Sequence, residues 1–183
     1  MPHDHPHRPH EHRRQPGIPD QHKARGPKNA RVYVVTCSDS RTAATDEGGN
    51  AIKAMLADRG HELAGAAIIP DEPERIADEL KRAREQGAQA VLFTGGTGIS
   101  SRDRTFDAVS AAIARPLPGF GELFRMLSFQ EIGSAAMLSR AIAGVTGEGM
   151  IVFAMPGSPA AVRLACERLV LPELTHLLEE LGR

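Results

Sequence analysis

Residues 91–105 read VLFTGGTGISSRDRT, an apolar run that ends abruptly in a glycine-rich turn. In open α/β sheets, ligands bind where a strand feeds such a turn at its carboxyl end. The glycines let backbone amides approach an anion closely, and the helix expected after the turn adds a favourable dipole. The stretch therefore predicts an α/β fold with a site for a phosphate or a nucleotide.

Asp103 lies five residues beyond the last glycine of this turn. A carboxylate repels a phosphate, so its place beside an anion-binding loop calls for a bridging cation. Mg²⁺ is commonly bound through one or two carboxylates together with substrate phosphates. The spacing thus favours an enzyme that handles phosphate groups with the help of Mg²⁺.

Apolar runs and amphipathic stretches alternate along the chain from residue 31 onward. This alternation is typical of a mostly parallel sheet flanked by helices, in a single domain. The residues before the glycine-rich segment 144–149 could form a strand that pairs with 150–155 or an irregular segment, and the sequence leaves both open. Strands are expected at 31–36, 63–69, 88–94 and 150–155, and helices at 50–59, 74–86, 104–115, 120–132 and 159–181, the last with a kink at Pro172.

Composition narrows the class of protein. The chain has 183 residues, of which 41% are hydrophobic, enough for one globular domain. Beyond residue 29 it is mildly acidic, which argues against nucleic acid as the main partner. Cys37 and Cys166 follow no metal-binding spacing and fit a reducing compartment. No apolar run is long enough for a membrane span or a signal peptide, so we expect no membrane partner and a cytoplasmic location.

The first 29 residues differ from the rest and contain six of the eight histidines and six of the thirteen prolines. They offer almost nothing apolar to bury, so we predict a disordered leader at 1–29 and a folded domain at 30–183. Clustered imidazoles could collect Ni²⁺, Zn²⁺ or Cu²⁺. The irregular spacing favours the alternative, a solvated leader without such a role.

Several polar segments follow directly after predicted strands. Ser38 and Asp39 follow the first strand, Asp71 the second and the glycine turn the third, with 156–158 after the last. Because carboxyl ends of parallel strands share one edge of a sheet, these segments should meet there. Asp71 has an alternative interpretation, in which it begins the helix that follows it.

Other catalytic arrangements find less support in the sequence. A Gly-x-x-x-x-Gly-Lys-Ser/Thr loop and a helix-opening Gly-x-Gly-x-x-Gly are both missing from the sequence, which disfavours kinase-like and dinucleotide-binding mechanisms. His61 and His176 are interpreted as surface residues. Cys37 is interpreted as a small buried thiol rather than a nucleophile.

Six ordered motifs resemble the MoaB/MogA family of molybdenum cofactor biosynthesis proteins over about residues 30–181, and the segment 124–133 favours its MoaB branch. The motifs are Val35-Thr36-Cys37-Ser38-Asp39-Ser40-Arg41, Ile69-Pro70-Asp71-Glu72, Thr94-Gly95-Gly96-Thr97-Gly98-Ile99-Ser100-Ser101-Arg102-Asp103, Pro118-Gly119-Phe120-Gly121-Glu122, Met137-Leu138-Ser139-Arg140 and Met155-Pro156-Gly157-Ser158-Pro159.

The resemblance implies a three-layer α/β sandwich that assembles as a homotrimer or hexamer. It also implies transfer of AMP from the co-substrate Mg-ATP to molybdopterin with release of pyrophosphate, before a downstream metal-insertion protein takes the product. Asp71 and Asp103 would serve catalysis and Mg²⁺ binding, and Ser139 would contact the pterin. The full set of implied substrate-binding residues is Ser38, Asp39, Gly95, Gly96, Thr97, Gly98, Ser139, Gly157 and Ser158.

The chain keeps the Arg102-Asp103 pair, which inactive members of the family lose, and this favours an active enzyme. It departs from the family pattern at Gly48, where a serine is usual, and at Phe106, where proline is typical. A non-catalytic molybdopterin carrier or scaffold therefore remains the alternative function. Molybdenum or tungsten usage, and trimer or hexamer, are left open.

Overall fold

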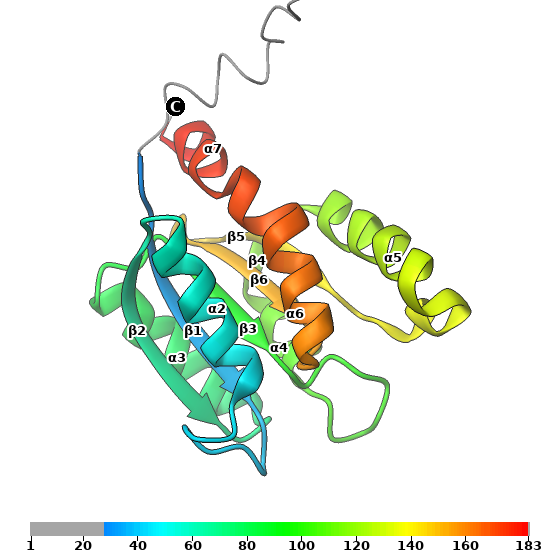
Figure 1. The fold of residues 1–183 in the computed structure, drawn as a ribbon. Helices are drawn as coiled ribbons and strands as arrows, with labels where there is room; N and C mark the ends of the chain where they lie inside the picture. The colour runs from blue at the N-terminus through cyan, green and yellow to red at the C-terminus, as the bar shows by residue number, and fades with distance from the viewer. Residues whose placement is uncertain (1–27, 183) are drawn as a thin grey trace, which may run out of the picture.

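The computed structural model describes residues 28–182, and its centre is a six-stranded sheet in the order β2-β1-β3-β6-β5-β4 (Figure 1). The predicted leader lies almost entirely outside these residues. The strands are β1 Arg31–Cys37, β2 Glu62–Ile69, β3 Ala90–Thr94, β4 Ile113–Pro116, β5 Ile142–Thr146 and β6 Ile151–Met155. The helices are α2 Glu47–Asp58, α3 Pro73–Glu85, α4 Thr105–Ala112, α5 Pro118–Ile132, α6 Pro159–Ala165 and α7 Leu171–Leu181, with a 3-10 helix η1 Gly133–Leu138 and a π-helical turn η2 Cys166–Val170.

Helices cover both faces of the sheet, which gives three layers. Helices α2, α5, α6 and α7 lie on one face, and α3 and α4 on the other (Figure 1). Strands β2, β1, β3 and β6 are parallel, whereas β5 runs antiparallel to β6 and β4 antiparallel to β5. The predicted fold class, a single α/β domain with a mostly parallel sheet, is confirmed.

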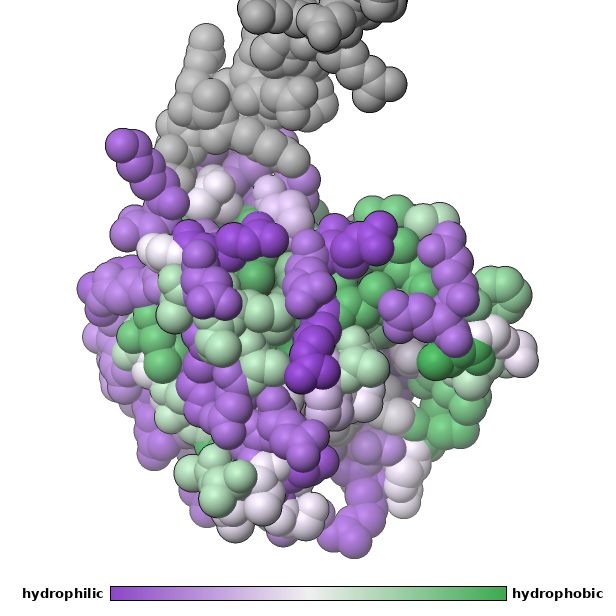
Figure 2. Space-filling view, in the orientation of Figure 1, coloured by the Kyte–Doolittle hydropathy of each residue, from purple (hydrophilic) through white to green (hydrophobic). Residues whose placement is uncertain are grey.

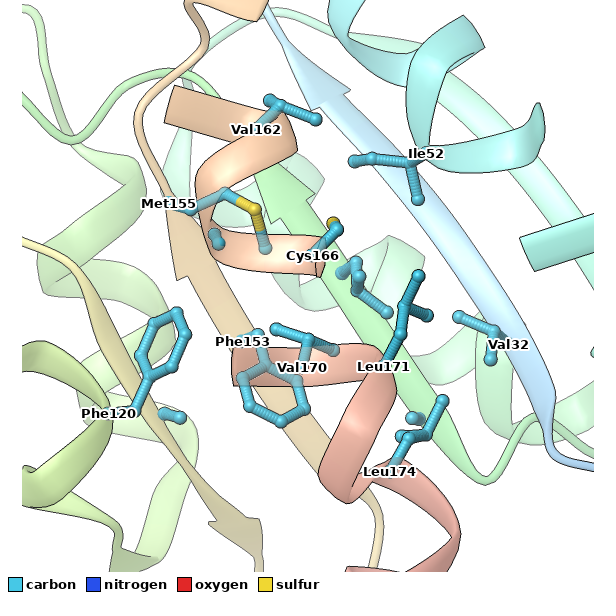
Figure 3. Packing of buried hydrophobic residues seen from close by; sticks show 14 of the residues in the cluster. Val32, Ile52, Phe120, Phe153, Met155, Val162, Cys166, Val170, Leu171 and Leu174 are labelled. Atoms are coloured by element: carbon cyan, nitrogen blue, oxygen red, sulfur yellow. The ribbon is translucent and has the colours of Figure 1, made fainter. Parts of the chain in front are cut away.

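The central strands β1, β3 and β6 are almost wholly apolar because both of their faces are buried. In β1, Val32 and Val34 pack on one face while Tyr33 and Val35 pack on the other. Figure 3 shows the first of these cores, where helices α2, α6 and α7 lay aliphatic side chains on the sheet. Phe120 of α5 adds an edge-on ring contact to Phe153, with centroids 5.2 Å apart.

The prediction of one helix over 104–115 is wrong at its end. Helix α4 stops at Ala112, and Ile113–Pro116 forms the edge strand β4, paired with β5. Gly144 of β5 allows this pairing, since a side chain there would meet the Arg115 carbonyl oxygen at 2.7 Å. A proline on an edge strand loses no interior hydrogen bond of the sheet, so Pro116 is tolerated.

Two other segments also differ in detail from expectation. Helix α2 begins at Glu47, three residues earlier than predicted, because Asp46 caps it by accepting a hydrogen bond from the Gly49 amide at 2.9 Å. The segment 144–149 does separate a strand pair, β5 and β6, which answers the question left open above. The last predicted helix is continuous through η2 into α7. None of the helices within residues 28–182 is long and apolar enough to cross a membrane.

The order of the strands creates a crevice between β1 and β3. The chain leaves β1 for α2 on one face of the sheet, and it leaves β3 for α4 on the opposite face. Where neighbouring strands send their loops to opposite faces, the loops part at the carboxyl edge, and ligands bind there. The glycine turn predicted as the site lies at this position.

Candidate active site at the carboxyl edge of the sheet

Two glycines make the loop after β3 possible. Gly95 and Gly96 have φ angles of +96° and +61°, in the left-handed region that favours glycine. A side chain on Gly95 would collide with the carbonyl oxygen of Cys37, at the end of β1. One on Gly96 would collide with the Asp71 carboxylate. The loop is thus drawn tightly against the carboxyl ends of β1 and β2.

Asp71, which follows β2, holds the start of α4. Its Oδ1 accepts a hydrogen bond from the Thr105 hydroxyl at 2.8 Å, and its Oδ2 accepts one from the Arg104 amide at 3.1 Å. The alternative interpretation of Asp71 as the first residue of the next helix is wrong, because Glu72 occupies the N-cap of α3 and no side chain caps that helix. Asp71 instead reaches across the crevice.

The environment of Asp71 disfavours its charged form. Burial raises the pKa of the Asp71 carboxyl above its ordinary value, and the nearby charge of Asp103 adds to the rise. Hydrogen bonds from Thr105 and the Arg104 amide act in the opposite direction. Perturbed carboxyl groups of this kind gather at functional sites more often than elsewhere.

Asp103 lies on the other side of the same loop. Its Oδ2 accepts a hydrogen bond from the Ser100 amide at 2.9 Å, and a side chain on Gly98 would lie 2.7 Å from that oxygen. Within residues 28–182, no group of three or more His, Cys, Asp or Glu side chains could hold a metal by itself. Asp71 and Asp103 therefore fit Mg²⁺ only as part of a set completed by phosphate oxygens and water, the usual mode for this ion.

Asp39 and Arg102 form an ion pair across the mouth of the crevice, with 2.7 Å between Asp39 Oδ2 and Arg102 Nη2. Both line a surface hollow of about 470 Å³, together with Asp71, Ser101 and Arg104. Glu72 and Glu74 line it as well, so two guanidinium groups and four carboxylates share one opening. Such a hollow can accept a polyphosphate that carries a cation.

The remaining predicted residues are divided between ligand surface and local structure. Ser139 and Arg140 line a second hollow of about 380 Å³. Ser139 and Ser158 both line a smaller hollow of about 110 Å³. The Ser158 hydroxyl caps α6 by accepting from the Ala161 amide at 3.2 Å. Ser38 has a comparable local role, accepting from the amide of Arg41 at 3.2 Å.

Gly157 and Gly95 bring the loop after β6 and the glycine loop together. A side chain on Gly157 would lie 3.1 Å from the Gly95 Cα, and the Gly95 amide donates to the Met155 carbonyl oxygen at 3.0 Å. Thr97, within the glycine loop, is buried. Thus 38–39, Asp71, the glycine loop and 157–158 meet at one edge as predicted, while Ser139 faces a neighbouring hollow.

Sequence reasoning missed the most extensively bonded side chain of the site, Arg140. Its guanidinium donates to the carbonyl oxygens of Gly98 and Asp103, both at 2.8 Å. Thr105, which donates to Asp71, was missed as well. The sequence marked Arg140 only as the residue after Ser139. Its partners Gly98 and Asp103 lie 42 and 37 positions earlier, and no local pattern indicates contacts over such distances.

The other candidates for chemistry lie outside the site or are inert. Burial raises the pKa of the Cys37 thiol to about 12, so it stays protonated at neutral pH, in agreement with its interpretation as a buried thiol. His61 Nδ1 accepts from the Ala30 amide at 3.2 Å, and His176 lies 3.2 Å from Glu173. Both histidines have structural partners, contrary to the view of them as plain surface residues.

The comparisons with known proteins agree with this geometry. A family profile described as "Probable molybdopterin binding domain" matches residues 33–176. The chain belongs to the molybdenum cofactor biosynthesis family. This confirms the resemblance drawn from the motifs, including its MoaB branch.

Relatives and solved structures within the family match nearly full length. "Molybdenum cofactor biosynthesis protein B" of Halalkalibacterium halodurans is 46% identical over 164 residues, covering 88% of this chain and 96% of that protein. A crystal structure of a protein of the same name has a TM-score of 0.82 at 47% identity, covering 86% of this chain and 98% of that one. The tungsten cofactor synthesizing protein MoaB from Pyrococcus furiosus has a TM-score of 0.79 at 34% identity, covering 86% and 99%.

Proposed function

We propose that the chain transfers AMP from Mg-ATP to molybdopterin, giving adenylylated molybdopterin and pyrophosphate. The observation that carries this proposal is the placement of Asp71 and Asp103 against one glycine loop, at the crevice between β1 and β3. The names of the relatives supply the pathway, since they place similar chains in molybdenum cofactor biosynthesis.

In this reaction a phosphate oxygen of molybdopterin attacks the α-phosphorus of ATP. The new P–O bond forms as the bond between the α-phosphorus and its bridging oxygen breaks, and pyrophosphate carries the electron pair away. Nucleophile and electrophile are both anionic, so catalysis rests on positioning and on neutralising charge. No side chain has to act as a nucleophile.

The residues of the site divide these tasks. Amides of the glycine loop face the phosphates, and Arg102 and Arg104 at the hollow add positive charge. Asp71 and Asp103 would hold Mg²⁺, which when bound offsets the charge that builds up on the phosphate oxygens. Ser139, in the adjoining hollow, would face the pterin.

Pyrophosphate release tests the proposal. Purified protein with Mg-ATP should release pyrophosphate when molybdopterin is present and only traces of it when molybdopterin is omitted. Binding of molybdopterin without any release would support the alternative function, a carrier or scaffold. One feature favours that alternative, because Gly48 offers no hydroxyl where the family has a serine. A Cβ atom added at Gly48 would lie 3.3 Å from the Gly157 carbonyl oxygen, so the missing hydroxyl would have been close to the loop after β6.

We propose that the chain is a homo-oligomer, a trimer or a hexamer. In α5, Phe120 and Phe124 are buried, whereas Phe129 is 61% exposed and Met137 of η1 is 77% exposed. Figure 2 shows hydrophobic residues gathered over the side of the molecule where α5 lies in Figure 1. The exposed apolar residues of this face are Leu123, Met126, Phe129, Ile132, Met137 and Leu138.

A surplus apolar face of this size usually meets another subunit. We therefore predict that sedimentation at micromolar concentration shows a trimer or hexamer, and that Phe129→Asp shifts the protein toward the monomer. Glu62 is exposed on β2, the opposite edge strand of the sheet. Glu62→Asp serves as the control and should leave the mass of the oligomer unchanged. A wild-type monomer at that concentration would contradict the prediction.

The His-rich leader is expected to be dispensable for catalysis. It has no apolar segment to fix it to the domain, and β1 begins at Arg31, at the edge of the sheet opposite the glycine loop. Deleting residues 1–29 should leave turnover unchanged and weaken binding of Ni²⁺ or Zn²⁺, measured by calorimetry. A large fall in turnover would overturn this expectation.

A further inference from the structure

We infer that Arg140 is a positioning residue that sets the conformation of the glycine loop, a role that rests on the proposed function. Its Nε donates to the Gly98 carbonyl oxygen at 2.8 Å and to that of Thr97 at 3.4 Å. Its Nη2 donates to the Asp103 carbonyl oxygen at 2.8 Å. One side chain therefore joins the beginning and the end of the loop.

The guanidinium of Arg140 is itself held on its other sides. Nη1 lies 3.1 and 3.2 Å from the two carboxylate oxygens of Asp107, and the group stacks over the ring of Phe106 with 4.9 Å to its centroid. A planar fork fixed by a carboxylate and an aromatic face loses little freedom when it binds carbonyl groups. Phe106, where the family has proline, thus provides a platform for Arg140 in this chain.

The peptide between Asp103 and Arg104 connects Arg140 to Asp71. All described peptide bonds are trans, so the carbonyl and the amide of one peptide point in opposite directions. The carbonyl of this peptide accepts from Arg140, and its amide donates to Asp71 Oδ2 at 3.1 Å. Fixing the carbonyl therefore also fixes a donor to the proposed catalytic carboxylate.

The same geometry sets two amides that can meet a phosphate. Because the carbonyl groups of Thr97 and Gly98 face Arg140, the amides of Gly98 and Ile99 point away from it. Neither amide donates to another group in the described part of the chain. Outward amides in a glycine-rich turn form the concave surface that binds anions.

Arg140 also lies between the two hollows of the site. It lines the hollow that contains Ser139, whereas the loop that it holds borders the one that contains Asp71. The loop thus separates the proposed pterin side from the proposed nucleotide side. We expect its conformation to determine whether the two phosphates are aligned, more than whether either one binds.

The test replaces Arg140 by lysine, which keeps the charge but cannot reach three carbonyl groups and Asp107 together. We expect Arg140→Lys to lower kcat about tenfold or more, with a smaller change in the KM for Mg-ATP. Hydrogen exchange of the Arg104 amide should become faster, while that of Phe93 in β3 stays at the wild-type rate. Phe106→Leu should also lower kcat and speed exchange of the Arg104 amide, by a smaller amount in each case. If Arg140→Lys does not fold, the Phe106→Leu protein provides the test.

The matched control is Arg84→Lys, since Arg84 is exposed on α3 and lies away from the loop. It should behave as wild type in both measurements. Wild-type kcat or wild-type exchange at Arg104 in the Arg140→Lys protein would overturn the inference, because charge alone would then suffice. If wild-type protein transfers no AMP, the proposed function fails, and the exchange of the Arg104 amide, which needs no substrate, still decides the role of Arg140.

Discussion

Replacing Asp71 or Asp103 by asparagine is expected to lower turnover about a hundredfold or more, the scale for losing one preorganised electrostatic partner. Asparagine keeps the size of the side chain and one acceptor oxygen, so the contact of Asp71 with the Arg104 amide can survive. The substitution therefore removes charge more than shape. Steady-state release of pyrophosphate at saturating Mg-ATP measures the effect.

Folding should survive the Asp71→Asn substitution. The raised pKa means that the folded protein holds a proton on Asp71 more tightly than the unfolded chain does, so the ionised carboxylate opposes folding. Its cost appears as pH rises through the ordinary carboxyl range and is complete above the raised pKa. The melting temperature of Asp71→Asn minus that of the wild type should therefore increase as pH rises through that range, and the difference should persist at neutral pH.

Asp78→Asn, on the exposed face of α3, is the control for both variants and should match wild-type turnover. A fall in the turnover of Asp78→Asn would show that loss of a surface carboxylate is enough to lower turnover, and the effects at Asp71 and Asp103 could then not be assigned to the mechanism. Wild-type turnover in both Asp71→Asn and Asp103→Asn would remove these carboxylates from the reaction and favour another source of charge compensation.

Gly96→Ala is expected to be the most damaging small substitution in the loop. The new methyl group would collide with the Asp71 carboxylate and the Thr105 hydroxyl, and a φ of +61° costs a non-glycine residue about 1 kcal/mol. The loop or Asp71 must move, and turnover should fall by about a hundredfold. Thermal unfolding and pyrophosphate release, measured on the same sample, separate the loss of stability from the loss of turnover.

Gly147→Ala is the matched control, because an added side chain at Gly147 has no neighbour within 4 Å. Gly147 lies in the turn between β5 and β6, at the edge of the sheet away from the loop. It should retain wild-type turnover. Equal behaviour of Gly96→Ala and Gly147→Ala would show that the close approach of the loop to Asp71 is unimportant.

Much of the fold could be predicted because apolar runs and glycine stops mark the strands and helices of a parallel sheet. The β1, β3 and β6 strands show this, since burial of both faces leaves each of them almost wholly apolar. The edge strand β4 could not be predicted. Three of its four residues are exposed, so pairing with β5 rather than its own composition makes it a strand.

The site divides in the same way between local and distant determinants. The convergence of Asp71 with the glycine loop follows from the rule that parallel strands end at one edge, and it could be predicted. The hydrogen bonds of Asp71 to the start of α4, and those of Arg140 to the loop, join segments 33 to 43 residues apart. Such contacts depend on the packing of α4 and η1, which no local pattern encodes.

The most direct test of the central claim follows the AMP group itself. Wild-type protein is incubated with molybdopterin and Mg-ATP labelled at the α-phosphate, and the pterin product is separated and counted. We predict that label appears in molybdopterin in a one-to-one ratio with the pyrophosphate released, and that it falls to near background in Asp71→Asn. Molybdopterin that binds the protein but stays unlabelled in the presence of Mg-ATP would contradict the account and show a carrier instead.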